Sequence, residues 1–196
     1  DQLASRLSAV AARFDLALTC VQTDGSQPVG RGIGPGLEAF DVLAVLQNAP
    51  DAPDDLRRRA ILLAGAALEI GGKAAKGKGE ALALATLVDG RAWSKFMAIC
   101  EAQGGLREPP KAAQVHPLIA SRAGRVVHIN NRKIARLAKL AGAPESKAAG
   151  VQMAVGLGDE IDSGQPLLHV HAETAGELGY ALDYAAHAGD LFEVES

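Results

Sequence analysis

The sequence predicts an α/β fold for its first half and an α+β fold for its second half. In the first half, helical periodicity, one short apolar run and a glycine-rich loop alternate, which is the rhythm of α/β proteins. Beyond a Pro-Pro segment this pattern gives way to short strand-like runs. Aromatic residues make up only 4% of the 196 residues, so we expect a core of Leu, Val, Ile and Ala. Such a core favours close-packed helices and helix-on-sheet layers.

The first half opens with a helix in which Leu3, Leu7 and Val10 recur at helical spacing, and Phe14 closes it. The run from Leu16 to Gln22 is short and nearly continuous in apolar residues, which predicts a strand buried on both faces. A glycine-rich loop follows, and further helices are expected after it. They are predicted to begin near Gly36 and to cover residues 54–70, 79–89 and 91–103.

A domain boundary is predicted at Leu106–Lys111, because its paired prolines cannot continue a helix. We therefore divide the chain into residues 1–106, a linker of residues 107–112 and a second unit of residues 113–196. That second unit is predicted to hold short strands and two helices. The strands are expected at 116–119, 124–129, 151–155, 166–171 and 191–194, and the helices at 133–141 and 175–188.

Composition and charge narrow the class of protein. The net charge is −3 and acids and bases are interspersed, which excludes the basic stripe of a nucleic-acid-binding protein. The chain contains no stretch of about 18 apolar residues, so we expect no membrane span. We also see no secretory signal at its start. Cys20 and Cys100 lie in apolar runs, so we expect buried thiols and a cytoplasmic protein. The start at Asp1, directly in a helical pattern, is expected of a fragment.

The alternating glycines Gly30, Gly32, Gly34 and Gly36 are the most unusual feature of the first half. A glycine-rich turn before a helix can bind an anion through free N–H groups, but these glycines match neither the dinucleotide fingerprint nor the P-loop. A tight turn with a purely structural role is the alternative. Carbonyl groups of the loop, with a carboxylate such as Asp41 or Glu38, could also hold a hard cation.

No catalytic constellation stands out elsewhere. His169 and His171 fall on one face of a predicted strand and could bind a metal, but no third ligand has suitable spacing. Glu69 before Gly71-Gly72 is interpreted as a surface charge beside a helix C-cap. No serine lies in a Gly-x-Ser-x-Gly setting. We therefore expect no catalytic residue in the chain.

The stretch from Gly158 to Leu167 resembles the "Gly-Asp-x-Val-x-x-Gly-x-x-Leu" turn and strand of biotinyl and lipoyl carrier hammerheads. A carrier needs an exposed lysine at a hairpin tip, flanked by Met or Ala. Lys147 is the nearby lysine, and its Glu-Ser-Lys-Ala-Ala setting does not match. A hammerhead without a prosthetic group is favoured, and a non-catalytic interaction module built on such a hammerhead remains an alternative function.

Several motifs resemble the thymidine and pyrimidine nucleoside phosphorylases. Thr23-Asp24, Gln27-Pro-Val-Gly30 and Ile33-Gly34-x-x-Leu37-Glu38 are similar to that family's "Thr-Asp-Met-x-Gln-Pro-Leu-Gly … Gly-Asn-Ala-Leu-Glu" segment. The residues of this segment are most similar to those of the subgroup that contains the AMP phosphorylases and their bacterial relatives called putative thymidine phosphorylases. Further matching stretches cover almost the whole chain: Glu101–Gly105, Ile129–Asn131, Ala141–Pro144 and Gly150.

The resemblance implies that residues 1–106 are the trailing piece of a phosphorylase α/β domain and that residues 113–196 are its C-terminal α/β hammerhead domain. Members of the family are glycosyltransferases that convert a nucleoside and phosphate into a free base and a pentose 1-phosphate. Their phosphate loop and base-recognising residues lie upstream of the matching segment. We therefore expect no catalytic or substrate-binding residue here and an inactive fragment. The parent's partners would be phosphate and a pyrimidine nucleoside, or a nucleoside monophosphate if it is an AMP phosphorylase.

Some bacterial relatives bind a potassium-like ion, and the resemblance places its ligands on the carbonyls of Val29 and Gly32 and the carboxylate of Asp41. The family's carboxylate is a Glu, one methylene longer. No other cofactor is expected. The strand at Leu16–Gln22 should find its sheet neighbours mostly in the upstream part, so the chain is expected to self-associate as a homo-oligomer through this exposed strand.

Overall fold

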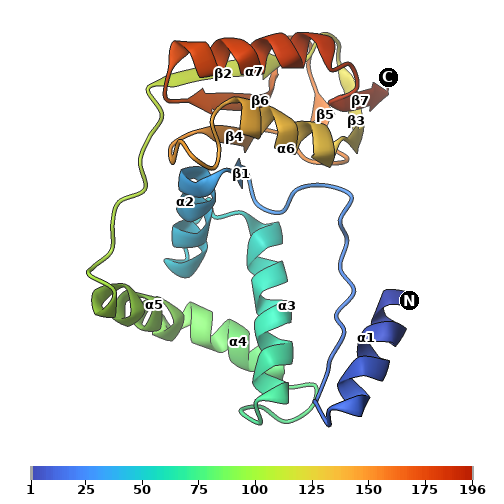
Figure 1. Ribbon diagram of the computed structural model, residues 1–196, viewed down its shortest axis with the longest axis vertical. Helices are drawn as coiled ribbons and strands as arrows, with labels where there is room; N and C mark the ends of the chain where they lie inside the picture. Colours follow the sequence, from blue (N-terminus) through green and yellow to red (C-terminus); the bar gives the residue numbers. More distant parts are fainter. Residues whose placement is uncertain (1, 196) are drawn as a thin grey trace.

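The computed structural model describes residues 2–195 and contains helices and two antiparallel sheets. Figure 1 shows the two sheets with helices α6 and α7 at one end of the molecule, and α1, α3, α4 and α5 at the other. We call residues 2–106 the helical part and residues 113–195 the sheet part. Helix α2 and the short strand β1 lie between the two ends. The structure is therefore mixed α and β, as the sequence predicts.

The helices of the helical part lie close to their expected positions. They are α1 (Gln2–Arg13), α2 (Pro35–Leu46), α3 (Asp54–Ile70), α4 (Gly79–Val88) and α5 (Arg91–Ala102). Helices α3 and α4 cross with their backbones in close approach. A Cβ atom at Gly79 would lie 2.1 Å from the carbonyl oxygen of Gly65, and one at Gly65 would lie 2.6 Å from the amide nitrogen of Glu80. Glycine at both positions is therefore a requirement of this crossing.

The strand predicted at Leu16–Gln22 does not form. The segment runs as extended chain between α1 and the glycine loop, and Leu16 and Leu18 are 64% and 46% exposed. A strand needs neighbours for its ladder, and the part of the chain that the structure describes supplies none for this segment. For the same reason the predicted burial of Cys20 is wrong, because this thiol is exposed. Cys100 is half-buried on α5.

The only strand of the helical part within the described residues is β1 (Gly32–Ile33), and it joins a sheet of the sheet part. The α+β character predicted for the second half is confirmed. One sheet has the order β1-β4-β6-β2 and the other β5-β3-β7. Their elements are β2 (Gln114–Ile119), β3 (Gly124–Ile129), α6 (Asn131–Leu140), β4 (Gly150–Met153), β5 (Glu160–Ile161), β6 (Pro166–Ala172), α7 (Ala175–His187) and β7 (Phe192–Glu195).

The hydrophobic core lies in the sheet part. Along β6 every second side chain is buried, while α6 turns Ile134, Leu137 and Ala138 inward at helical spacing. Each fully buried Leu, Ile or Val contributes about 1.5–3 kcal/mol of transfer free energy. The largest fully buried side chains all belong to this part: Val126, Ile129, Ile134, Leu137, Val151, Leu168 and Val170.

Charge is divided along the sequence of the second half. Residues 109–144 hold seven Lys and Arg and no Asp or Glu, whereas residues 145–196 hold ten Asp and Glu and one Lys. The fold brings the two segments together. Lys133 forms an ion pair with Asp190 and also donates to the Ala188 carbonyl at the end of α7, at 2.6 Å. Arg125 donates to the Gly158 carbonyl at 3.2 Å. Opposite charges on the two segments therefore favour their association.

Candidate functional site

The glycine loop joins the helical part to the sheet part through its backbone. Gly32 and Ile33 pair antiparallel with Gln152 and Val151 of β4. The amide of Met153 donates to the Arg31 carbonyl at 2.8 Å, which extends the pairing by one residue. On the other side of β1, the amide of Gly36 donates to the Lys147 carbonyl at 2.9 Å.

The alternation of glycines has a steric cause. A Cβ atom at Gly32 would lie 2.4 Å from the carbonyl carbon of Leu37, and one at Gly34 would lie 2.3 Å from the carbonyl oxygen of Ala149. On the facing strand, a Cβ atom at Gly150 would lie 2.1 Å from the Ile33 carbonyl oxygen. Backbone fills the space that a side chain would need at each of these positions. Between an anion-binding turn and a purely structural turn, this geometry favours the structural turn.

The start of α2 offers few free donors to an anion. The amide of Gly34 donates to the Glu38 carboxylate at 3.0 Å, and that of Gly36 is already paired with Lys147. A carboxylate of the chain thus occupies the place at the helix N-terminus that a bound phosphate would take. From the sequence we expect Arg31 and Gly32 to lie together in an exposed loop that faces the phosphate site. The structure exposes Arg31, as expected, but it buries Gly32, so the expectation is wrong for Gly32.

Two carboxylates hold the loop from the helical side. One Asp41 oxygen accepts the amides of Arg31 at 2.6 Å and Gly32 at 2.7 Å, and Asp55 accepts the amide of Gly30 at 3.0 Å. Hydrogen bonds to an ionised carboxylate are among the stronger hydrogen bonds of a protein. The loop is therefore held against α2 and the first turn of α3. Nothing in the local sequence distinguishes Asp55 from a helix-start residue, which is why its second role was missed.

The residues expected to ligate a potassium-like ion lie in this same loop-and-helix unit. Asp41 contacts the amide of Gly32, and Val29 directly precedes Gly30. The Asp41 oxygen that accepts these two amides is committed to them. Within residues 2–195 no three His, Cys, Asp or Glu side chains gather closely enough to hold a metal ion.

Polar side chains of the phosphorylase-like motifs tie the loop to the rest of the molecule. Asn131 Nδ2 donates to the Gly25 carbonyl at 2.9 Å, and Gln27 Oε1 accepts the amide of Leu157 at 2.6 Å. A cavity of about 480 Å³ lies beside Gln27, between the loop, the start of α3 and the turn after β4. Its charged lining residues are Arg31, Asp54, Asp55 and Asp159. These motif residues have structural partners that only the fold reveals.

Asp24 belongs to the same motif and lies in an exposed turn. Its carboxylate accepts the amide and the hydroxyl of Ser26, both at 2.9 Å, and its carbonyl accepts Arg59 at 2.7 Å. The Ser26 amide is the main cause that lowers the pKa of Asp24, and its hydroxyl and Arg59 add to the effect. The carboxylate is therefore charged and committed to its own turn.

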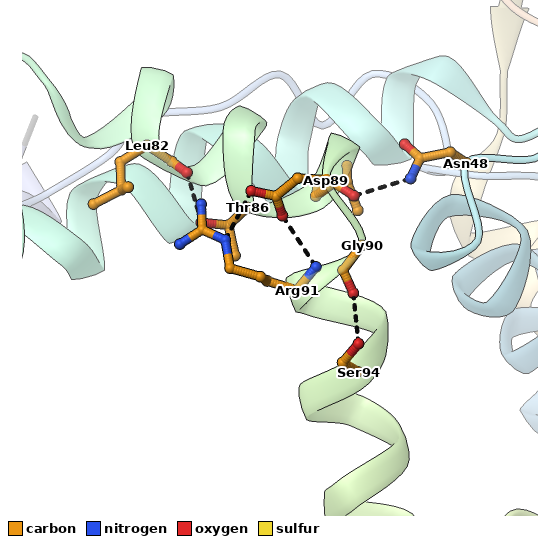
Figure 2. Close-up of polar contacts among 8 residues, drawn as sticks. Asn48, Leu82, Thr86, Asp89, Gly90, Arg91 and Ser94 are labelled. Atoms are coloured by element: carbon orange, nitrogen blue, oxygen red, sulfur yellow. Dashed lines mark hydrogen bonds and ion pairs between the residues drawn. The ribbon is translucent and has the colours of Figure 1, made fainter.

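A polar network connects the ends of α2 and α4 with the start of α5 (Figure 2). Asn48 Nδ2 donates to the Leu87 carbonyl at 2.9 Å, and Asp89 accepts the amide of Arg91 at 3.1 Å and its Nε at 2.7 Å. The Arg91 amide is the first cause of the lowered pKa of Asp89. Ser94 donates back to the Gly90 carbonyl at 3.1 Å. The contacts of Asp89 and Ser94 lie within the turn between α4 and α5, whereas Asn48 joins the end of α2 to α4, so this network positions helices.

Glu69 and the histidines are placed as follows. The Glu69 carboxylate accepts the amide of Gly79 at 2.9 Å, which lowers its pKa and caps the start of α4, so its interpretation as a simple surface charge is wrong.

His169 and His171 both lie on β6, as predicted. Burial, followed by the charge of His169, lowers the pKa of His171. His171 is therefore neutral near pH 7.

Lys147 lies in the turn between α6 and β4, where its Nζ donates to the Pro144 carbonyl at 2.9 Å. This is not the hairpin tip of a carrier lysine. Within residues 2–195, none of the helices has both the length and the apolar character needed to cross a membrane.

No family model matches the chain. Curated relatives match it over all or nearly all of its length. It is 81% identical over 196 residues to a "Putative thymidine phosphorylase" of Chelativorans sp. (strain BNC1), of which it covers 38%. It is 61% identical over 195 residues to one of Tolumonas auensis and 50% identical over 189 residues to one of Legionella pneumophila (strain Corby), covering 39% and 37% of them. The chain thus spans about two fifths of the length of these relatives, and it belongs to their family, the putative thymidine phosphorylases, as a C-terminal part.

Proposed function

We propose that this chain is the non-catalytic C-terminal part of a thymidine phosphorylase-type pentosyltransferase. The observation that carries the proposal is the 81% identity, over all 196 residues, to a protein named for that activity. In the reaction, phosphate attacks C1′ of the nucleoside while the bond to the base breaks, and the base leaves with a proton donor or hydrogen bond to assist it. The products are a free base and a pentose 1-phosphate.

The role of the chain in that enzyme would be to position the glycine loop. The polar groups of residues 24–41 that we describe are bound within the chain: Asp41 and Asp55 hold loop amides, and Gln27 holds the Leu157 amide. Strand β4 holds the loop from the other side. A loop fixed from both sides is a rigid surface against which an upstream phosphate-binding segment can be placed.

We further propose that residues 1–106 complete the phosphorylase α/β domain and that residues 113–196 form a hammerhead domain. The turns of the Gly158–Leu167 stretch support this proposal, because Gly158 and Gly164 have φ values of +92° and +84°, which glycine adopts at little cost. Nothing in the surroundings of Lys147 favours the carrier alternative.

A chimera tests the function. The C-terminal part of the Chelativorans protein is replaced by residues 1–196, and base release from thymidine, uridine and AMP is measured with phosphate present. We expect the chimera to match the unaltered relative within a few-fold. We expect the isolated chain to release no base above a no-protein control.

The three substrates also separate the nucleoside from the nucleotide alternative. Preference for AMP over thymidine would assign the parent to the AMP phosphorylases. If the folded relative and the folded chimera were both inactive on all three substrates, the proposed function would be wrong.

A further inference from the structure

Strand β6 carries two histidines on the face of its sheet that is turned away from the hydrophobic core. Leu168 and Val170 are fully buried in that core, and His169 and His171 alternate with them along the strand. Because successive side chains of a strand point to opposite faces, the two imidazoles lie on the same face. Their Cα atoms are about 7 Å apart, as expected for two residues along an extended chain. The sheet therefore presents two half-buried imidazoles side by side.

The neighbouring strand β4 places a further donor beside this pair. Gln152 lies directly opposite His169, and its side chain is exposed. Side chains opposite each other on neighbouring strands share a face, with Cβ atoms about 4.5–5.5 Å apart. Opposite His171, β4 has Gly150, which has no side chain to cover the imidazole. The amide oxygen of Gln152 is therefore a third donor, and the local sequence around the histidines does not reveal it.

The pair is open on the side of β2. This strand is the last of its sheet, and its residues Val115 and Pro117 lie opposite His171 and His169. Both residues are exposed, so no other part of the described chain covers this edge. A small ion can therefore approach the imidazoles from the β2 side.

The two imidazoles have nitrogens that the chain itself does not use. Among the histidines that the structure describes, only His187 has a hydrogen bond or an ion pair. Nε2 of His171 is buried without a partner, and an unpaired buried polar atom costs free energy that a ligand at that nitrogen would recover. A half-turn of the ring about its Cβ–Cγ bond exchanges the places of Nε2 and Cε1, which turns the nitrogen away from its buried position. Burial, followed by the charge of His169, lowers the pKa of His171, so the ring is neutral near pH 7, the form that binds metal ions.

We propose that His169, His171 and Gln152 form a site for a divalent transition-metal ion such as Zn²⁺, with water completing its coordination. Imidazole nitrogens are ligands for such ions, whereas Mg²⁺ and Ca²⁺ take oxygen ligands. Zn–N bonds of about 2.0–2.1 Å place two tetrahedral ligand nitrogens roughly 3.3 Å apart, a separation that two side chains on alternate residues of a strand reach by converging. The set contains two His, Cys, Asp or Glu side chains, in agreement with the absence of a cluster of three within residues 2–195.

An ion at this site would connect strands beside the glycine loop. Gln152 pairs with Gly32 of β1 on one side and with His169 of β6 on the other. The ion would therefore hold β6 to the strand on which the loop is paired. A ligand that binds only the folded state stabilises it, so the expected role is structural. The site is independent of the proposed phosphorolysis.

Titration calorimetry with Zn²⁺ gives the first test. It uses the 196-residue chain without a polyhistidine tag, treated with a chelator and kept at low micromolar concentration. We expect one ion to bind per chain and to be removed by EDTA. The thermal midpoint should rise by about 5 °C or more when free Zn²⁺ exceeds its dissociation constant about 100-fold. Absence of binding, or an unchanged midpoint, would overturn the proposal.

Histidine variants show where the ion binds. His169→Gln and His171→Gln should each weaken Zn²⁺ binding at least about tenfold, since even the loss of an outer partner of a metal ligand has an effect of this size. In the unaltered chain, the ring-proton NMR signals of both histidines should shift when Zn²⁺ is added. His187→Gln is the matched control, because His187 and Asp183 form an exposed pair one turn apart on α7. If His187→Gln removes binding while both β6 variants keep it, the ion binds to α7 and the proposal is wrong.

Substitutions of Gln152 test the third ligand. Gln152→Glu replaces the amide oxygen with a charged carboxylate oxygen, which should tighten Zn²⁺ binding by about tenfold. Gln152→Ala should weaken binding several-fold. The side chain is exposed, so both variants should fold, and circular dichroism checks this. Equal affinity of the unaltered chain and both variants would contradict the site as proposed, whatever the activity of the enzyme.

Discussion

One carboxylate oxygen of Asp41 accepts the amide of Gly32 at 2.7 Å and also that of the preceding residue. This contact fixes the glycine loop on α2 at the point where β1 begins. Asp41→Ala would leave two loop amides without their acceptor, so we expect it to lower the free energy of unfolding by about 1–3 kcal/mol. Urea denaturation measures the change. Asp54→Asn is the matched control, because Asp54 forms only an exposed ion pair with Arg58 and its loss should cost under about 1 kcal/mol.

A monovalent cation should stabilise the chimera with the Chelativorans protein if Val29, Gly32 and Asp41 supply part of its ligands. We expect its thermal midpoint to be higher in potassium chloride than in tetramethylammonium chloride at equal ionic strength. Asp41→Asn should remove the difference. If the midpoint is the same in both salts, the assignment of an ion to this loop is incorrect.

Glycine at position 34 is required because backbone lies where its side chain would be. Gly34 has a φ of +132°, and a Cβ atom would lie 2.3 Å from the Ala149 carbonyl oxygen. Gly34→Ala must therefore strain the loop and separate it from β4, and we expect a loss of about 3 kcal/mol or more. Gly179→Ala is the control: it lies within α7 with nothing near its Cβ position, and alanine should stabilise the helix by about 0.5–1 kcal/mol. We expect Gly34→Ala to lower the urea midpoint of the chain and Gly179→Ala to raise it.

The helix-capping group at the start of α7 should make stability depend on pH. Glu177 accepts the Ser146 hydroxyl at 2.9 Å, and this bond, with those from Thr174, lowers its pKa below the ordinary value of 4.5. A lowered pKa stabilises the folded state fully above the ordinary value, and the contribution is lost as pH falls through the folded pKa. Glu177→Gln should therefore be less stable than the unaltered chain at pH 7, and the difference should shrink toward pH 3. Urea midpoints across this range measure it, and a constant difference would contradict the assignment.

Local signals predicted the helices well. The expected helices at 79–89 and 91–103 end within a residue of the observed ones, since periodicity and the stop signals at Asp89 and Gly104 act within one or two turns. The strand at Leu16–Gln22 could not be judged in this way, because a strand depends on neighbouring strands that are distant in the sequence. The burial expected of Cys20 failed for that reason as well.

The alternating glycines drew attention to the loop, but the contacts that require them could not be derived from the local sequence. Glycine is required at position 34 because the backbone of Ala149, far along the chain, lies where a side chain would be. The role of Asp55 is to accept the amide of Gly30, which is 25 residues away in the sequence. Neither contact leaves a local pattern. Gln27 and Asn131, which belong to the family motifs, bind the backbone of Leu157 and Gly25 and thereby join the two parts.

The isolated chain should self-associate through the exposed apolar residues of α1 and of the segment Leu16–Val21, because nothing else in solution is available to cover them. Leu16 is 64% exposed and belongs to a segment with free ladder groups, which is a template for pairing with another chain. We expect sedimentation to show a monomer at low micromolar concentration and a dimer at tens of micromolar. Leu18→Asp should shift the chain toward the monomer, since charges in the middle of a shared strand oppose pairing, while Tyr180→Asp should not. A monomer at all concentrations, with slow exchange across residues 16–21, would mean that the chain satisfies this segment by itself.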